Sequence, residues 1–334
     1  TDYFNTKLYT GGSGDTAHTG VGFQPDLVWI KERTRTRNHA RFDVIRGPRY
    51  WIGSHSGDGQ DYNSGAYLVS LDSDGFTTTD TDVVGKNSYT YASWNWKANG
   101  AGSANTDGSI NSTVSVNSTA GFSIVSYTGT GSNPATVGHG LGVTPKMIIV
   151  KPRSIAYSWC VYHVDAGAGN LLYYDTNGAA GGSSVWNSTS PTSSVFTVND
   201  NQVNKSGETH IAYCFAEKTG YSRFSSYKGN GNANGTFVYT GFKPAFVMCK
   251  RTDGGTQNWC IMDNKRGYNP DVQQLHPNTS GVETLGSGDT LDLLSNGFKM
   301  RATDGDKNGN GETFIYMAIG QSLVGSNNVP CTGV

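Results

Sequence analysis

The sequence has few charged residues and no long hydrophobic run. Charged residues make up only 15% of the 334 residues, and the formal net charge is −1. A chain with so little net charge gives no reason to expect nucleic acid as a partner. No apolar segment reaches the ~18 residues of a membrane-spanning helix, and we find no secretory signal, so we expect no membrane insertion.

Motifs of the common enzyme classes are also missing. The sequence contains no G-x-S-x-G, H-E-x-x-H, C-x-x-C, G-x-G-x-x-G or P-loop pattern. Its seven histidines never stand at metal-ligand spacing on one short segment. We therefore predict a protein that is not an enzyme, with no cofactor and no metal site.

Cysteine is scarce and gives no disulfide framework. The number is odd, and the spacings match no known pattern. The five positions are Cys160, Cys214, Cys249, Cys260 and Cys331. We expect Cys160 and Cys260 to be small buried apolar residues. We expect no structural disulfide, as suits folding in a reducing cytoplasm.

One segment has part of the pattern of a calcium loop. Residues 304–309, Asp-Gly-Asp-Lys-Asn-Gly, place oxygen ligands at alternate positions and glycine sixth, as an EF-hand loop does. The twelfth position is Ile315, where the bidentate glutamate should stand, and no helical pattern flanks the segment. We interpret the segment as a polar hairpin turn.

What the sequence does contain is a threefold internal repeat. The pattern Gly-x-x-Pro, five further residues and lysine occurs at residues 22–31, 142–151 and 241–250. A recurrence at roughly 100 residues indicates three copies of one folding unit. A chain copied three times more often displays surface than carries out chemistry, because a single active site breaks the symmetry.

The repeat divides the chain into three units. We place unit 1 at residues 1–98, unit 2 at residues 121–220 and unit 3 at residues 221–322. Residues 99–120 are mostly Gly, Ala, Ser, Asn and Thr, so they are predicted to be a linker. Residues 323–334 are predicted to form a C-terminal tail.

Composition favours an all-β fold. The chain contains 45 Gly, 18 Tyr, 13 Phe and 7 Trp, and short β-branched or aromatic segments alternate with Gly, Asn, Asp and Ser clusters. A unit of roughly 100 residues with about seven strands suits one β-sandwich. We predict three tandem sandwich-like repeats. The alternative is one pseudo-threefold, prism-like assembly whose units share strands across their junctions.

The candidate ligand-binding residues lie in a glycine-rich stretch of unit 1. Tyr50 and Trp51 stand beside Arg49, His55 and Asp58. Exposed aromatic side chains flanked by polar groups are typical of sugar-binding surfaces, because a sugar offers both apolar ring faces and hydroxyl groups. We select these five residues as a candidate site for carbohydrate binding, with core packing as the alternative role of the aromatic pair.

Charged residues form two notable patterns. Asp43 with Arg46, and Asp263 with Arg266, occupy matching places in units 1 and 3, which favours a salt bridge that holds a turn. A catalytic carboxylate pair is the alternative. Basic residues also cluster at 31–49, either as a solvated loop or as a site for acidic glycan or phosphate.

Several strings resemble a repeated module in virion proteins of tailed bacteriophages, mainly marine ones. They lie at residues 19–31, 93–98, 137–142, 213–218, 237–244 and 327–330. Proteins of that family are usually described as structural, tail-fibre or appendage proteins without a defined activity. The resemblance implies assembly in the host cytoplasm, a virion location and no catalytic residues.

The sequence therefore favours a non-enzymatic virion structural protein, a tail fibre or appendage with a role in host adhesion and receptor binding. The expected partners are other virion proteins and host-surface polysaccharide. Three similar units favour multivalent binding, and we expect a homo-oligomer. The alternatives are a polysaccharide-degrading tailspike enzyme and a capsid decoration protein.

Overall fold

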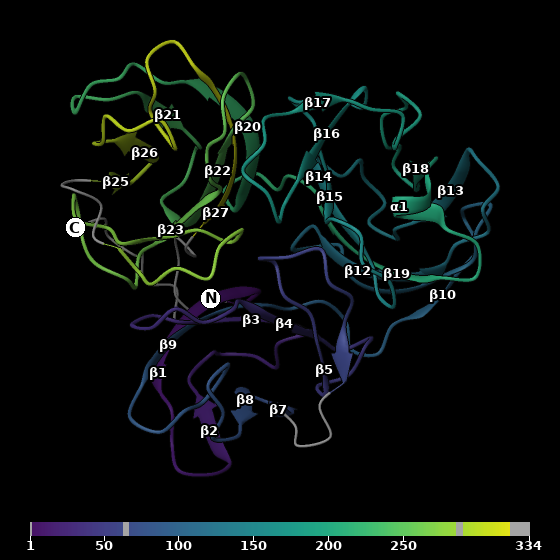
Figure 1. Ribbon diagram of the computed structural model, residues 1–334, viewed down its shortest axis with the longest axis horizontal. Helices are drawn as coiled ribbons and strands as arrows, with labels where there is room; N and C mark the ends of the chain where they lie inside the picture. The colour runs from purple at the N-terminus through teal and green to yellow at the C-terminus, as the bar shows by residue number, and fades with distance from the viewer. Residues whose placement is uncertain (1, 63–66, 285–289, 321–334) are drawn as a thin grey trace.

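The computed structural model describes residues 2–62, 67–284 and 290–320 (Figure 1). Across these residues the regular structure is β-strand, apart from one four-residue helix, α1 (Asn201–Asn204). The predicted all-β class is confirmed. No helix within the described ranges is long and apolar enough to cross a membrane. The predicted tail at 323–334, with Cys331, lies outside the described residues.

Unit 1 is a sandwich of a large and a small antiparallel sheet. The large sheet has the order β1-β9-β3-β4, and the small sheet has the order β2-β8-β7. Strands β5 and β6 form a separate two-stranded ribbon. The bounds are β1 (Phe4–Thr10), β2 (Thr16–Thr19), β3 (Leu27–Glu32), β4 (Ala40–Asp43), β5 (Tyr50–Trp51), β6 (Asp61–Tyr62), β7 (Leu68–Asp72), β8 (Gly75–Thr78) and β9 (Thr90–Trp96).

Unit 2 repeats this order with additions at both edges. Its large sheet contains β12-β19-β14-β15 in the places of β1-β9-β3-β4, and its small sheet is β13-β18. The bounds are β10 (Ser103–Asn105), β11 (Ser112–Asn117), β12 (Phe122–Thr128), β13 (Ala135–Gly138), β14 (Met147–Pro152), β15 (Cys160–His163), β16 (Asn170–Tyr173), β17 (Gly181–Gly182), β18 (Val195–Val198) and β19 (Thr209–Phe215).

Unit 3 has the same arrangement a third time. Its large sheet is β20-β27-β22-β23, extended by β24, and its small sheet is β21-β26-β25. The bounds are β20 (Ser222–Lys228), β21 (Phe237–Tyr239), β22 (Pro244–Arg251), β23 (Cys260–Asp263), β24 (Gln274–Leu275), β25 (Leu291–Leu294), β26 (Gly297–Met300) and β27 (Thr313–Gly320). The internal repeat of the sequence is therefore a repeat of strand order.

The segment predicted as a linker, residues 99–120, carries two strands of the unit 2 sheet. Strand β11 pairs with β12 along its whole length, and β10 pairs with β11. The open edge of β12 supplies backbone partners, and Val114 of β11 is buried. Few apolar residues are needed to form a strand at an existing edge, which is why composition alone indicated a linker.

Each unit has a hydrophobic cluster between its own two sheets. The clusters include Val28, Phe42 and Phe76 in unit 1, Val137, Ile148 and Phe196 in unit 2, and Val247, Phe298 and Phe314 in unit 3. These clusters are the cores of three sandwiches.

A fourth cluster at the centre of the molecule is shared by all three units. It includes Trp29, Trp94 and Trp96 of unit 1, Met147, Ile149 and Phe215 of unit 2, and Phe246, Met248 and Met317 of unit 3. Each large sheet is therefore covered on both faces. As a result, β3, β4, β14 and β15 are buried at every position instead of at alternate positions.

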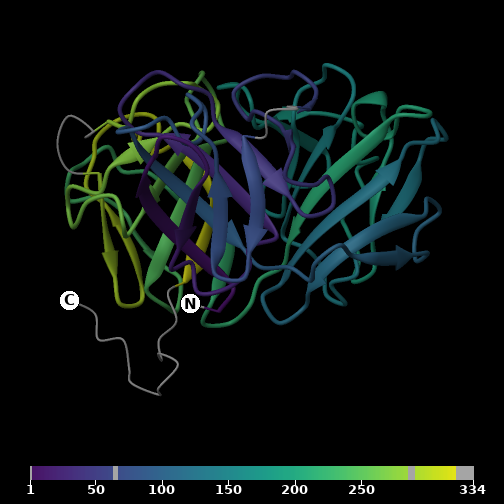
Figure 2. The same cartoon turned by 90° about the horizontal axis from the view of Figure 1, so that it is seen from below.

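The three units surround this centre with approximate threefold symmetry (Figure 1). In Figure 2, which is seen from below, unit 1 (purple and blue) is nearest to the viewer, in front of the other two units. Within the described ranges no sheet contains strands of two units. The architecture is thus three tandem sandwiches around a common core. Among these residues it has the threefold arrangement of the alternative prediction but not its shared strands.

Candidate functional site

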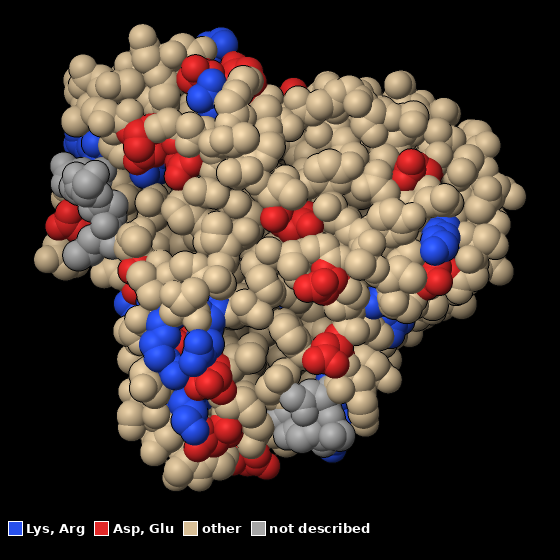
Figure 3. Space-filling view, viewed as in Figure 1, with Lys and Arg blue, Asp and Glu red and all other residues tan. Residues whose placement is uncertain are grey.

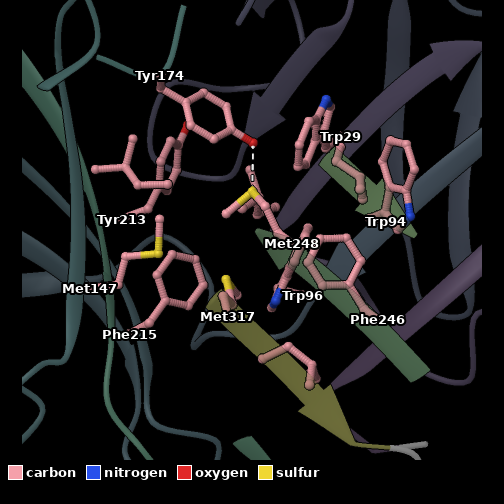
Figure 4. Close-up of a cluster of buried hydrophobic side chains, with 14 of the residues drawn as sticks. Trp29, Trp94, Trp96, Met147, Tyr174, Tyr213, Phe215, Phe246, Met248 and Met317 are labelled. Atoms are coloured by element: carbon pink, nitrogen blue, oxygen red, sulfur yellow. Dashed lines mark hydrogen bonds between the residues drawn. The ribbon is translucent and has the colours of Figure 1, made fainter. Parts of the chain in front are cut away.

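The centre of the molecule leaves little space for a ligand. A cavity of about 20 Å³ lies within the shared cluster, lined by side chains of all three units (Figure 4). A single water molecule needs roughly 10–15 Å³, so the cavity has room for one guest of about that size. Tyr174 lines the cavity and donates its hydroxyl hydrogen to Met248 Sδ at 3.2 Å. The centre is therefore no site for an organic substrate.

A closed ring of hydrogen bonds joins the three units around this cavity. In each unit the residue before the fourth strand of the large sheet donates to a main-chain oxygen of another unit. The bonds are Trp159 Nε1 to Gly53 O at 2.8 Å, Trp259 Nε1 to Tyr173 O at 2.9 Å, and His39 Nε2 to His276 O at 3.1 Å. They run from unit 2 to unit 1, from unit 3 to unit 2, and from unit 1 to unit 3.

The lysine of the repeated sequence motif is buried in each unit. Burial lowers the pKa of Lys31, Lys151 and Lys250 to about 8. Lys151 Nζ donates to Gly57 O of unit 1 at 2.9 Å, and Lys250 Nζ donates to Asn177 O of unit 2 at 3.3 Å. The motif therefore marks structural contacts, and not a ligand site.

The recurring Asp–Arg pairs are buried salt bridges that hold turns, as predicted. Arg46 Nε lies 2.5 Å from Asp43 Oδ2, and Arg266 Nε lies 2.6 Å from Asp263 Oδ2. In both pairs the other carboxylate oxygen accepts the main-chain N–H of the arginine. Each carboxylate thus closes its own turn.

Donors from other units also reach these two carboxylates. The Tyr213 hydroxyl of unit 2 donates to Asp43 Oδ2 at 2.8 Å, and Trp94 Nε1 of unit 1 donates to Asp263 Oδ2 at 2.9 Å. All four groups are buried. Carboxylates so fully engaged are unsuited to act as the acid and base of glycoside hydrolysis, which needs contact with substrate.

His163 occupies the matching position in unit 2. Its Nδ1 accepts the main-chain N–H of Asp165 at 3.2 Å, so the hydrogen is on Nε2 and is donated to Tyr316 O of unit 3 at 3.1 Å. Burial lowers the pKa of His163 to about 4, which makes the ring neutral near pH 7. Both nitrogens serve the junction between units 2 and 3.

The aromatic pair selected from the sequence is split by strand geometry. Successive strand residues face opposite sides, so Tyr50 and Trp51 point apart. Tyr50 packs against Tyr62, with ring centroids 5.0 Å apart, and Tyr62 is 54% exposed. Trp51 donates its Nε1 hydrogen to Asp61 at 3.3 Å and packs against Tyr67 over the unit 1 core. Only the tyrosine side of the pair resembles a sugar-binding surface.

The other three selected residues differ in their exposure. Arg49 and Asp58 are exposed, and His55 is half-buried. Burial lowers the pKa of His55, and the charge of Asp58 opposes that shift. The loop that carries His55 and Asp58 packs on unit 2, where Gln60 N donates to Arg153 O at 2.6 Å. This loop is a contact between units.

An open pocket of about 150 Å³ lies in unit 3, beside the turn that Asp263 holds. The lining residues are Lys243, Asn264, Gly267, Tyr268, Asn269, Val272 and Leu293. Tyr268 is 79% exposed. Asn269 ties the loop to β25, because its Oδ1 accepts Leu293 N at 2.8 Å and its Nδ2 donates to Leu293 O at 3.1 Å. The pocket combines an aromatic ring with amide and ammonium groups.

The sequence analysis missed Tyr268, although the repeat contains a signal for it. Tyr268 directly follows the turn at 263–267, where unit 1 has Pro48 and unit 2 has Ala168. Gly267 has a φ of +98°, and a Cβ there would lie 2.4 Å from a main-chain oxygen, so the turn requires glycine. Comparing the units position by position would have singled out this exposed aromatic residue.

Three arginines of the basic run of unit 1 are paired with carboxylates. Arg35 Nη1 and Arg37 Nη2 lie 3.0 and 3.3 Å from Asp82, and Arg33 Nη2 lies 2.7 Å from Glu283 of unit 3. Figure 3 shows this mixed group of positive and negative side chains on unit 1, at the lower left. Opposite charges this close leave little net positive potential, which disfavours a site for acidic glycan or phosphate.

The described side chains that converge closely enough to hold a metal ion are Cys260, His276 and Asp306, whose ligand atoms lie within 4.8 Å of one another. His276 Nδ1 lies 2.8 Å from Trp259 O and 3.7 Å from Cys260 Sγ. A hydrogen bond from Cys249 lowers the pKa of Cys260, against the effect of burial. Burial acts to lower the pKa of His276, but Cys260 outweighs it and raises the value to about 9. The Cys260 thiol and the His276 imidazole are thus neighbours, and Trp259 O is the nearer partner of the imidazole.

The other described cysteines and the calcium-like segment have structural roles. Cys160 and Cys214 are buried, and burial raises the pKa of both thiols. Cys160 is therefore a small buried core residue, as predicted, and Cys260 is buried as well. Residues 304–309 form a polar turn before β27. The Lys307 ammonium contacts the Asp304 carboxylate inside that turn.

Comparison with known proteins places the chain in a family. No curated protein matches it. Residues 1–322, which span all three units, match the model of a domain of unknown function, DUF7483, and the chain belongs to that family.

Proposed function

We propose that the chain is a non-enzymatic structural module of a bacteriophage virion, of the tail-fibre or appendage kind, which binds host-surface saccharide through its loops. The resemblance of the repeat to virion modules supports the virion setting. The packing supports a non-enzymatic role, because His163, Asp43 and Asp263 are engaged in contacts that hold the units together.

The pocket around Tyr268 carries the saccharide part of the proposal. Tyr268 is 79% exposed, and together with Lys243 and Asn264 it lines this pocket of about 150 Å³. A sugar ring stacks on such an aromatic face while amide and ammonium groups bind its hydroxyl groups. A contact this small binds weakly, and several copies on one particle raise the overall affinity.

The test is an array of host-surface polysaccharides, probed with the wild type and with Tyr268→Ala, Tyr62→Ala and Val143→Ala. Tyr62 reports on the β5–β6 ribbon, and Val143, which is 41% exposed, is the control on unit 2. We expect Tyr268→Ala to weaken binding about tenfold, since loss of a ring contact is worth ~1.4 kcal/mol. Val143→Ala should bind as the wild type does.

Other results of the same experiment would redirect or reject the proposal. Weakening by Tyr62→Ala alone would move the site to unit 1. Absence of binding by the wild type would contradict saccharide recognition and leave an architectural role. Shortening of a polysaccharide would indicate the tailspike enzyme. The capsid decoration protein needs a separate experiment, in which labelling of particle heads in electron micrographs would indicate that role.

A further inference from the structure

A buried arginine without a carboxylate partner lies beside the central cavity. Arg41 is 3% exposed, it takes part in no ion pair among the described residues, and its Nη1 has no hydrogen-bond partner. Three aromatic rings surround the guanidinium. Its central carbon lies 4.1 Å from the ring centroid of Trp29, 4.4 Å from that of Tyr174 and 4.8 Å from that of Trp159. Aromatic faces attract a cation but do not accept its remaining N–H group well.

A second unsatisfied donor belongs to the same cavity. Trp96 is 3% exposed, and its Nε1 has no partner either. Both Arg41 and Trp96 line the cavity of about 20 Å³, and Figure 4 shows Trp96 there beside Met317. Among the described cavity-lining residues, the buried side-chain atoms that lack a partner are these two donors. Buried polar groups nearly always have hydrogen-bond partners. We therefore expect the cavity to hold a molecule or ion that accepts hydrogen bonds from these two donors.

The charge of Arg41 restricts the class of ligand that suits the cavity. Burial lowers its pKa, but a guanidinium stays protonated in proteins. A buried charge needs a counter-charge, which a water molecule does not supply. The volume admits one water-sized guest and excludes carboxylate ligands and phosphate. We propose that the central cavity binds one small monovalent anion of the halide class, such as chloride, with Arg41 and Trp96 as its hydrogen-bond donors.

Comparison of the units shows that packing does not require the arginine. In the strand pairing, Arg41 lies opposite Trp29, as Val161 lies opposite Ile149 and Ile261 lies opposite Met248. Units 2 and 3 thus fill the equivalent positions with apolar residues of the shared cluster. An anion at this place would neutralise Arg41 and would link the packing of the three units to halide binding.

The first test compares stability in different anions. The wild type is unfolded with urea in sodium chloride, sodium bromide or sodium gluconate at equal ionic strength, since gluconate is too large for the cavity. For one bound ion, the unfolding equilibrium constant should fall about tenfold for each tenfold rise in halide concentration above Kd. Arg41→Ile, which copies unit 3, should abolish this dependence. Arg301→Ile, which alters a partly exposed pair with Asp292, should retain it.

The second test locates the ion directly. Crystals of the wild type grown in bromide should show an anomalous scattering peak in the cavity, within hydrogen-bond distance of Arg41 Nη1. Equal stability in halide and gluconate, with no such peak, would overturn the proposal in favour of a trapped water. Because both measurements use the wild type, they decide the question even if Arg41→Ile does not fold.

Discussion

Lowering the pH from 7 to 5 should destabilise the protein by about 2 kcal/mol through His163 alone. The pKa of this residue is about 4 in the folded protein against 6.5 for an unperturbed histidine. As the pH falls, the unfolded chain therefore binds a proton before the folded protein does. The contribution of His163 is complete above pH 6.5 and is lost between pH 6.5 and 4. Linkage at 1.36 kcal/mol per pKa unit gives a loss of about 2 kcal/mol at pH 5 and about 3 kcal/mol at pH 4.

The physical reason lies in the two partners of the imidazole. Nε2 already donates to Tyr316 O, and Nδ1 faces the main-chain N–H of Asp165. Protonation of Nδ1 would set one N–H against another and would place a charge in a buried junction between units 2 and 3. Burial lowers the pKa of His163 by more than the bond to Tyr316 O and the charge of Asp165 raise it.

The assay is urea unfolding of the wild type and His163→Gln at pH 7, 6 and 5. A glutamine amide can both donate and accept a hydrogen bond but does not titrate. His18 and His210, whose pKa values are also lowered to about 4, titrate in both proteins, so the difference between the two isolates His163. The wild type should lose about 2 kcal/mol more than the variant between pH 7 and pH 5. An identical pH dependence in the two proteins would refute the reasoning.

Two further predictions concern buried contacts, both measured as the free energy of unfolding in urea. Arg46→Met should cost roughly 3–5 kcal/mol, because it leaves the carboxylate of Asp43 buried and unpaired. Arg301→Met, at a more exposed ion pair, should cost less than about 1 kcal/mol, and equal costs for the two variants would contradict this account. Trp94→Phe removes the indole donor to Asp263 and should cost roughly 1–3 kcal/mol. A cost below about 0.5 kcal/mol would mean that this bond between units contributes nothing.

The repeat could be predicted from the sequence because the lysine of its motif has a specific structural role. Lys151 and Lys250 donate to main-chain oxygens of other units, a task that few other side chains could perform. Lysine therefore recurs at a fixed distance from the Gly-x-x-Pro turn. The arrangement around one centre was given only as the alternative prediction, because strands such as Leu27–Glu32 are buried on both faces and carry no alternation that marks an inner side.

Site residues were harder to predict than the fold. Tyr50 and Trp51 are neighbours in sequence, but the strand turns them to opposite faces. Cys260 and His276 are 16 positions apart, and Arg41 and Trp96 meet only at the centre. Local sequence spacing cannot predict that such residues lie close together, since this depends on how whole sheets pack.

The hydrogen bonds from unit 2 to unit 1, from unit 3 to unit 2 and from unit 1 to unit 3 return to their starting point. In an open solenoid each repeat contacts only its neighbours, so copies can be gained or lost along the chain. Here the ring of bonds is closed, so a fourth copy would have no unit left to bond with. A chain of only two copies would expose the tryptophans and methionines of the shared cluster to water. The number of copies is consequently fixed at three, and sequence variation is tolerated mainly on the surface of each unit that faces away from the shared cluster.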